Sequence, residues 1–166
     1  STHGVLIFKE DFPLGEEVKK LLDSEYVMFD INVTANRPDC QSILGLAREV
    51  AAVLDKPLKS PNFSYAADKS VSTCSTVKVT NNALDLCPRY ISHLVTDIKI
   101  ADSPMWIKRR LSAMGLRSIN NIVDITNFVL LEIGQPMHAF DLNDLSGNEI
   151  NVRPANDGDT IITLDD

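Results

Sequence analysis

The residues S-I-N-N-I-V-D-I-T-N-F-V-L-L-E-I-G-Q-P-M-H-A-F-D, from Ser118 to Asp141, decide the fold of this chain. The run predicts a helix that Ser118 caps at its start and that Gly134 and Pro136 end. Its apolar side chains cover so much of the helix surface that we expect burial on most sides. These apolar residues are Ile119, Ile122, Val123, Phe128, Val129 and Leu131.

Four polar side chains stand on or beside this expected buried helix: Asp124, Thr126, Asn127 and His138. Buried polar groups need hydrogen-bond partners in the protein or in a ligand, so this stretch is the first place to look for a site. The imidazole of His138 can orient a water molecule or a ribose hydroxyl near neutral pH, and Thr126 can hold the same water from the helix.

Each of these side chains also has a structural interpretation. His138 can bond a backbone carbonyl at the Pro136 corner, and the Thr126 hydroxyl can bond the preceding turn of its own helix. Asn127 and Asp124 can cap or join neighbouring loops. The residues alone leave both interpretations open.

The composition indicates a globular protein, with 44% hydrophobic and 23% charged residues in 166. That length gives one good core or two small ones. No apolar run is long enough for a membrane span, and residues 1–10 lack the pattern of a signal peptide. The three cysteines show no metal-ligand spacing and predict reduced thiols. We therefore expect a cytoplasmic location without membrane contact.

Metal and nucleotide sites are not indicated by the sequence. His3, His93 and His138 stand far apart, and no carboxylate lies at ligand spacing from any of them, so we expect no metal site. No glycine-rich phosphate loop is present, so any ATP is expected to bind outside this chain.

The net charge of −7 argues against a general nucleic-acid binder, but the charge is uneven. Segment 97–117 carries a local basic group, in which Trp106 can stack on RNA while the cations neutralise phosphates. The alternative is that Trp106 belongs to the core and the cations are solvated. The basic residues are Lys99, Lys108, Arg109, Arg110 and Arg117.

The order of expected elements is mixed, which predicts an α+β (mixed α/β) class. Ser103 is expected to cap the helix at 105–114, with Pro104 at its first position and Gly115 at its end. Arg37 is expected either to pair with a carboxylate across a domain seam or to lie in a surface turn. Besides the helix after Ser118, the expected helices are 16–22, 42–54 and 105–114. The expected strands are 5–8, 27–34, 76–79, 89–100, 150–153 and 160–164. The last two strands flank an expected turn at 156–158.

Four blocks of the chain closely resemble the bacterial phenylalanyl-tRNA synthetase beta-subunit family, in the same order. They are D-I-N-V-T-A-N-R-P-D-C-Q-S-I-L-G-L-A-R-E-V-A-A (30–52), C-P-R-Y (87–90), the G-L-R-S-I-N-N to H-A-F-D run (115–141) and T-L-D-D (163–166). The resemblance covers nearly the whole chain.

The resemblance implies a fragment of a longer chain. Residues 1–60 would be part of an amino-terminal domain and 76–166 the amino-terminal part of the editing domain, while the Ser, Asn, Ala, Lys and Thr-rich composition of 61–75 predicts a linker between them. The family's enzyme attaches phenylalanine to tRNA(Phe) with ATP and Mg²⁺, bound outside this chain, and is a heterotetramer of two alpha and two beta subunits. Its editing domain hydrolyses tRNA mischarged with tyrosine.

The resemblance also implies roles for single residues. Thr126 and His138 line the editing pocket and are the expected catalytic residues, with positioning roles. Pro136 falls on the pocket wall, and Asn127 is its neighbour on the substrate side. The family's tyrosine-recognising glutamate lies past Asp166, so the isolated chain is expected to be inactive.

Two other functions are considered beside editing. The first is a non-catalytic module that docks tRNA or the alpha subunit. The second is a free-standing editing hydrolase, which the resemblance of residues 1–60 to the synthetase disfavours.

Overall fold

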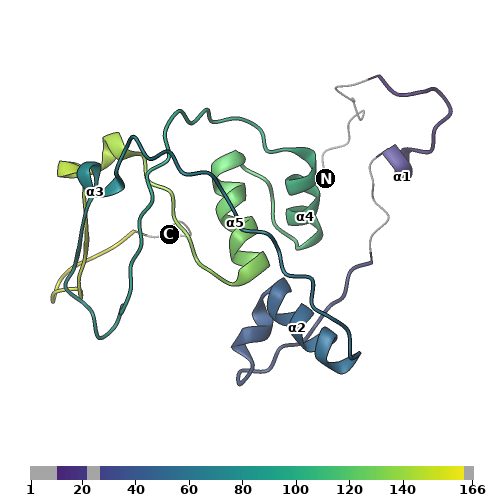
Figure 1. The fold of residues 1–166 in the computed structure, drawn as a ribbon, viewed down its shortest axis with the longest axis horizontal. Coiled ribbons are helices and arrows are strands. Elements are labelled where there is room, and N and C mark those ends of the chain that lie inside the picture. Colours follow the sequence, from purple (N-terminus) through teal and green to yellow (C-terminus); the bar gives the residue numbers. More distant parts are fainter. Residues whose placement is uncertain (1–10, 22–26, 163–166) are drawn as a thin grey trace. The chain divides into compact units, whose positions relative to one another are not determined.

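The computed structural model describes residues 11–21 and 27–162 (Figure 1). The chain divides into two compact units, Ser1–Thr34 and Ala35–Asp166, which are treated separately. The expected strand at 5–8 and the end of the one at 160–164 lie outside the described residues.

In the first unit, the expected helix at 16–22 is the short helix α1, Val18–Leu21. The expected strand at 27–34 is wrong, because these residues form neither helix nor strand. Their alternation is real, but Phe29 is 80% exposed and Val27 77% exposed. A strand needs a partner for its backbone N–H and C=O groups, and none pairs with this segment among the described residues.

The second unit begins with the 3-10 helix η1, Pro38–Gln41, followed by helix α2, Ile43–Val53, as predicted for 42–54. The Ser42 hydroxyl caps α2 by accepting from the backbone N–H of Gly45 at 3.1 Å. Gly45 is buried where η1 meets α2. A Cβ at this position would lie 1.7 Å from the carbonyl oxygen of Asp39, so the packing of η1 on α2 requires glycine.

Helices α4, Met105–Ala113, and α5, Asn121–Ile133, pack against each other, and α2 also contacts α5. Figure 1 shows α4 and α5 as neighbours. Ile107 and Leu111 are the buried apolar residues of α4. The expected glycine ends are confirmed, since Gly115 and Gly134 adopt φ +79° and +78°.

Both predicted serine caps are wrong. The cap of α5 is Asn120, whose side-chain oxygen accepts from the N–H groups of Ile122 and Val123, each at 3.0 Å. No side chain caps α4, which begins after Pro104. Ser103 and Ser118 instead donate to the carboxylate of Asp124, a charged acceptor.

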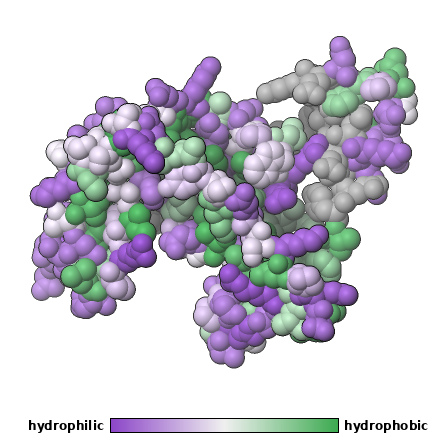
Figure 2. Space-filling model, in the orientation of Figure 1, coloured by the Kyte–Doolittle hydropathy of each residue, from purple (hydrophilic) through white to green (hydrophobic). Residues whose placement is uncertain are grey.

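The prediction that α5 is buried on most sides is also wrong. Asp124 is its one fully buried residue, while Ile125 is 43% and Leu130 40% exposed, and Ile119 just before the helix is 65% exposed. The helix packs mainly against α4 and α2, which leaves its remaining surface open. Figure 2 shows hydrophobic residues at the surface among hydrophilic ones.

Two short strands, β1 (Lys78–Asn81) and β2 (Glu149–Val152), form a parallel pair in which Lys78 faces Glu149. They correspond to the expected strands at 76–79 and 150–153, with shifted bounds. Residues before β1 form the helical turn α3, Thr73–Thr76. The 3-10 turns η2, Leu142–Asp144, and η3, Ser146–Asn148, precede β2.

A further expected strand, at 89–100, is wrong, and the described part of the one at 160–164 is not a strand. The turn between β2 and 160 is present, with the Asp159 N–H donating to the Asn156 carbonyl at 3.0 Å. Residues 160–162, the described part of the expected strand at 160–164, are not paired with β2, which pairs with β1.

The mixture of helices with a small sheet confirms the α+β class. The expected division into 1–60, 61–75 and 76–166 stays a prediction. The α2–α5 packing joins residues on both sides of the expected linker within one unit. Among the described residues, every helix is too short or too polar to cross a bilayer.

Candidate functional site

Asp124 anchors the stretch that carries the candidate site. Its fully buried carboxylate accepts hydrogen bonds from the Ser103 hydroxyl, from the Ser118 hydroxyl at 2.5 Å and from the Ile119 N–H at 2.8 Å. Ser103 precedes α4, and Ser118 and Ile119 lie in the loop before α5. The interpretation of Asp124 as a residue that joins loops is therefore confirmed.

Opposing effects act on the pKa of Asp124. Burial alone would raise this pKa, because a buried charge loses its hydration. The hydrogen bonds from Ser103, Ser118 and Ile119, with the nearby Lys108 cation, outweigh burial and hold the pKa below its ordinary value. The carboxylate is therefore ionised at neutral pH and fixes the start of both helices.

Thr126 lies one half-turn after this anchor and is half-buried on α5. Its hydroxyl donates to the backbone carbonyl of Val123 at 2.8 Å, as the structural interpretation expected. This bond uses the hydroxyl proton and fixes the rotamer, while the oxygen keeps lone pairs that can accept from water. Asn127 is also half-buried on α5.

His138 and Pro136 follow the end of α5 and are both exposed. The His138 ring packs on the ring of Phe140, with centroids 4.4 Å apart and an interplanar angle of 55°. In the described part of the chain no hydrogen bond joins His138 to Thr126. The four candidate residues thus lie on one continuous segment, with Thr126 and Asn127 half-buried and Pro136 and His138 exposed, and their roles stay predictions.

Trp106 combines features of both interpretations drawn from the sequence. It is 53% exposed, yet it packs edge-on against Phe128 of α5, at 5.3 Å and 88°. The Arg110 guanidinium lies 5.9 Å from the Trp106 ring and 5.8 Å from the Phe128 ring. This cation–aromatic cluster ties α4 to α5 and leaves one part of the indole open to solvent.

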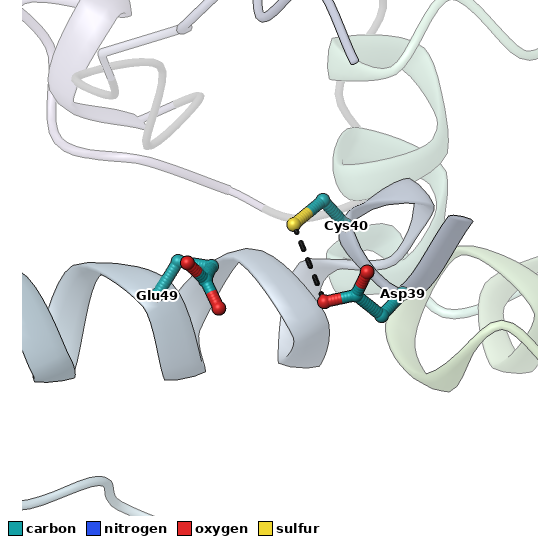
Figure 3. A group of neighbouring side chains, drawn as sticks. All are labelled: Asp39, Cys40 and Glu49. Atoms are coloured by element: carbon teal, nitrogen blue, oxygen red, sulfur yellow. Dashed lines mark hydrogen bonds between the residues drawn. The ribbon is translucent and has the colours of Figure 1, made fainter. Parts of the chain in front are cut away.

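A second cluster, at the junction of η1 and α2, was missed by the sequence reasoning (Figure 3). Ligand atoms of Asp39, Cys40 and Glu49 lie within 4.8 Å of one another, a grouping that could hold a metal ion. The Arg37 guanidinium forms ion pairs with both carboxylates of this group, at 2.7 Å from Asp39 and 2.6 Å from Glu49. The residues stand on two elements, so only the angle between η1 and α2 brings them together.

The ion pairs and the burial of this cluster shift the pKa values of Asp39, Arg37 and Cys40. The hydrogen bond from Arg37 lowers the pKa of Asp39 to about 2, and hydrogen bonds to Asp39 and then Glu49 raise the pKa of Arg37. Burial raises the pKa of the Cys40 thiol. The expected pairing of Arg37 with carboxylates is present, and both partners lie in its own structural unit.

Comparisons with known proteins show which families this sequence resembles. Residues 86–166 match the B3/4 domain family. The chain is 43% identical over 166 residues to the phenylalanine–tRNA ligase beta subunit of Syntrophus aciditrophicus, and 45% identical over 165 residues to that of Fusobacterium nucleatum. Each match covers 99% of this chain and 20% of the relative.

The chain matches one segment of the phenylalanine–tRNA ligase beta-subunit family. The resemblance drawn from the sequence is confirmed, and the chain spans about a fifth of the length of its relatives in that family. The B3/4 match contains the Asp124 anchor and all four candidate residues. The Arg37 cluster lies before that match but inside the beta-subunit match.

Proposed function

We propose that this chain is the part of a phenylalanine–tRNA ligase beta subunit that contributes to hydrolytic editing of tyrosyl-tRNA(Phe) and to tRNA binding. The observation that carries the proposal is the identity of 42–45% with beta subunits along 98–99% of the chain. The B3/4 match supports it, because it includes Thr126, Asn127, Pro136 and His138.

The similarity of tyrosine and phenylalanine explains why editing is needed. Tyrosine differs from phenylalanine by one hydroxyl, and an apolar pocket rejects an added hydroxyl by only about a hundredfold. A second site must then remove the error. Water attacks the ester carbonyl carbon, the bond to the ribose oxygen breaks, and a proton passes to that oxygen, which leaves free tyrosine and intact tRNA.

Thr126 and His138 suit positioning roles in this step. An aminoacyl ester is already activated, so the site needs an oriented water more than a strong base. The Thr126 oxygen, with its proton held by Val123, is an acceptor for that water. The exposed His138 ring is accessible to the water or to the terminal ribose. Pro136 and Asn127 would shape the substrate side.

The proposal extends to the whole enzyme. The parent synthetase would use ATP and Mg²⁺ bound outside this chain, would pair with alpha subunits as a heterotetramer of two alpha and two beta, and would act in the cytoplasm. The large apolar side chains that stay exposed, such as Phe29, Val53 and Leu130, support a place inside a larger assembly.

Deacylation of tyrosyl-tRNA(Phe) tests the proposal. The full-length beta subunit, assembled with alpha, is compared with its His138→Ala and Thr126→Ala variants. We expect slower clearance of tyrosyl-tRNA(Phe) by both, and clearance by both at the wild-type rate would refute the assigned roles and favour the docking module. The isolated 166-residue chain is expected to show no useful turnover, and measurable turnover would contradict that expectation.

A further inference from the structure

A shallow surface cavity of about 520 Å³, widely open to solvent, lies at the carboxyl end of α4, and none of the candidate editing residues lines it. It is formed where the chain turns back after α4 towards α5. Two of its lining residues are cations, two carry hydroxyls and one is a glycine. The lining residues are Lys108, Ser112, Gly115, Leu116, Arg117 and Ser118.

The turn at Gly115 creates this cavity. Gly115 adopts φ +79°, and the Leu116 N–H returns to the Leu111 carbonyl at 2.9 Å. This closure satisfies carbonyls at the end of the helix and reverses the chain, which brings Arg117 beside Lys108. No atom lies within 4 Å of the place where a Gly115 Cβ would stand, so the floor of the cavity is open.

Hydrogen-bond donors in this cavity are available to a ligand. Within the described residues, the Arg117 side chain takes part in no ion pair or hydrogen bond, and the backbone N–H groups of Arg117 and Ser118 have no acceptor. The Ser118 hydroxyl is not available, because it donates to Asp124. Guanidinium and backbone N–H groups together are donors suited to phosphate oxygens.

Two carboxylates lie beside the cavity: Asp124, which is buried behind the lining residue Ser118 and near Lys108, and the more exposed Asp102. The Lys108 ammonium pairs with the Asp102 carboxylate at 3.1 Å, and Asp102 is 68% exposed on its side chain. An exposed ion pair contributes little stability, so a phosphate can compete with it for the ammonium. Asp102 therefore weakens the cavity as an anion site without closing it.

We propose that this cavity binds a phosphate of the tRNA backbone, with Arg117 as the principal contact and Lys108 beside it. The inference deepens the proposed function and rests on it for the identity of the RNA. Four of the six lining residues are exposed, so a free small anion would stay largely hydrated there. A polyanion can also reach other cations of the chain, such as Arg109, which follows Lys108 on α4, and this favours a nucleic-acid backbone.

The test measures binding of uncharged tRNA(Phe) to the full-length enzyme across a range of salt concentrations. We expect Arg117→Ala to weaken binding about threefold to fivefold and to reduce the slope of log affinity against log salt by about one. The matched control is Arg48→Ala, which removes one exposed cation from α2 and is expected to leave the slope unchanged. Asp102→Asn is expected to tighten binding, because it releases Lys108.

Two results would overturn the proposal. The first is an unchanged salt slope in Arg117→Glu, which reverses the charge at an exposed position without threatening the fold. The second is thermal protection of the wild type, but not of Arg117→Ala, by millimolar inorganic phosphate or AMP while tRNA affinity stays equal, because the cavity would then serve a free anion. Deacylation by the Thr126 and His138 variants is read separately, so either proposal can fail alone.

Discussion

Asp124 offers the sharpest test of how this fold is held, because one buried carboxylate joins three segments. In Asp124→Ala, the hydroxyls of Ser103, which is 5% exposed, and of half-buried Ser118 lose their acceptor. Each unsatisfied buried donor costs about 1–3 kcal/mol, and rotation of the hydroxyls recovers a part. We therefore expect Asp124→Ala to lower the free energy of unfolding by about 3 kcal/mol.

Asp124→Asn keeps the shape and one acceptor oxygen for the Ile119 N–H, so it is expected to cost about half as much. Urea unfolding followed by the fluorescence of Trp106, the single tryptophan, measures both variants. The control is Asp85→Ala, an exposed carboxylate, with an expected change within about 0.5 kcal/mol. A loss below about 1 kcal/mol for Asp124→Ala would refute the anchor.

Three further predictions concern other parts of the second unit. Gly45→Ala drives a Cβ into the Asp39 carbonyl, so we expect the free energy of unfolding in urea to fall by about 2–3 kcal/mol. The control is Ala52→Ser, at an exposed position of the same helix, with an expected change of less than about 0.5 kcal/mol. Asp39 has its pKa lowered to about 2 in the folded chain, so the stability from its pair with Arg37 is present above about pH 4 and is lost as pH falls towards 2. Arg37→Met should flatten this acid limb of a pH titration of the melting temperature, and an unchanged limb would contradict the pairing. Arg37→Met should also let Zn²⁺ raise the melting temperature through Asp39, Cys40 and Glu49, an effect that Cys40→Ser should abolish.

Local signals predicted the parts of the fold that depend on neighbouring residues. Gly115 and Gly134 mark helix ends because a left-handed residue suits glycine wherever the helix lies. The stripe of 42–54 predicted α2, whose cap Ser42 is also local. Three polar residues stand near the start of α5 in the sequence. Asn120 is the cap because the Ser118 hydroxyl donates its hydrogen bond to the Asp124 carboxylate.

Non-local pairing accounts for the failures. The segments 27–34 and 89–100 alternate like strands, but alternation does not supply a neighbour with free backbone groups. β1 and β2 pair across about seventy residues, which no local pattern reveals. The Ser103–Asp124 and Arg37–Glu49 contacts likewise depend on helix packing, whereas the family resemblance found the segment that carries Thr126 and His138 without any geometry.

The editing roles of Thr126 and His138 are tested most directly by measuring two activities of the full-length enzyme that carries Thr126→Val, His138→Asn or both. Thr126→Val keeps the shape of the side chain and removes its oxygen, and His138→Asn keeps a polar group at an exposed position. We expect slower hydrolysis of tyrosyl-tRNA(Phe) in each variant, with phenylalanine charging of tRNA(Phe) unchanged. Equal loss of both activities, or wild-type hydrolysis in the double variant, would contradict these roles.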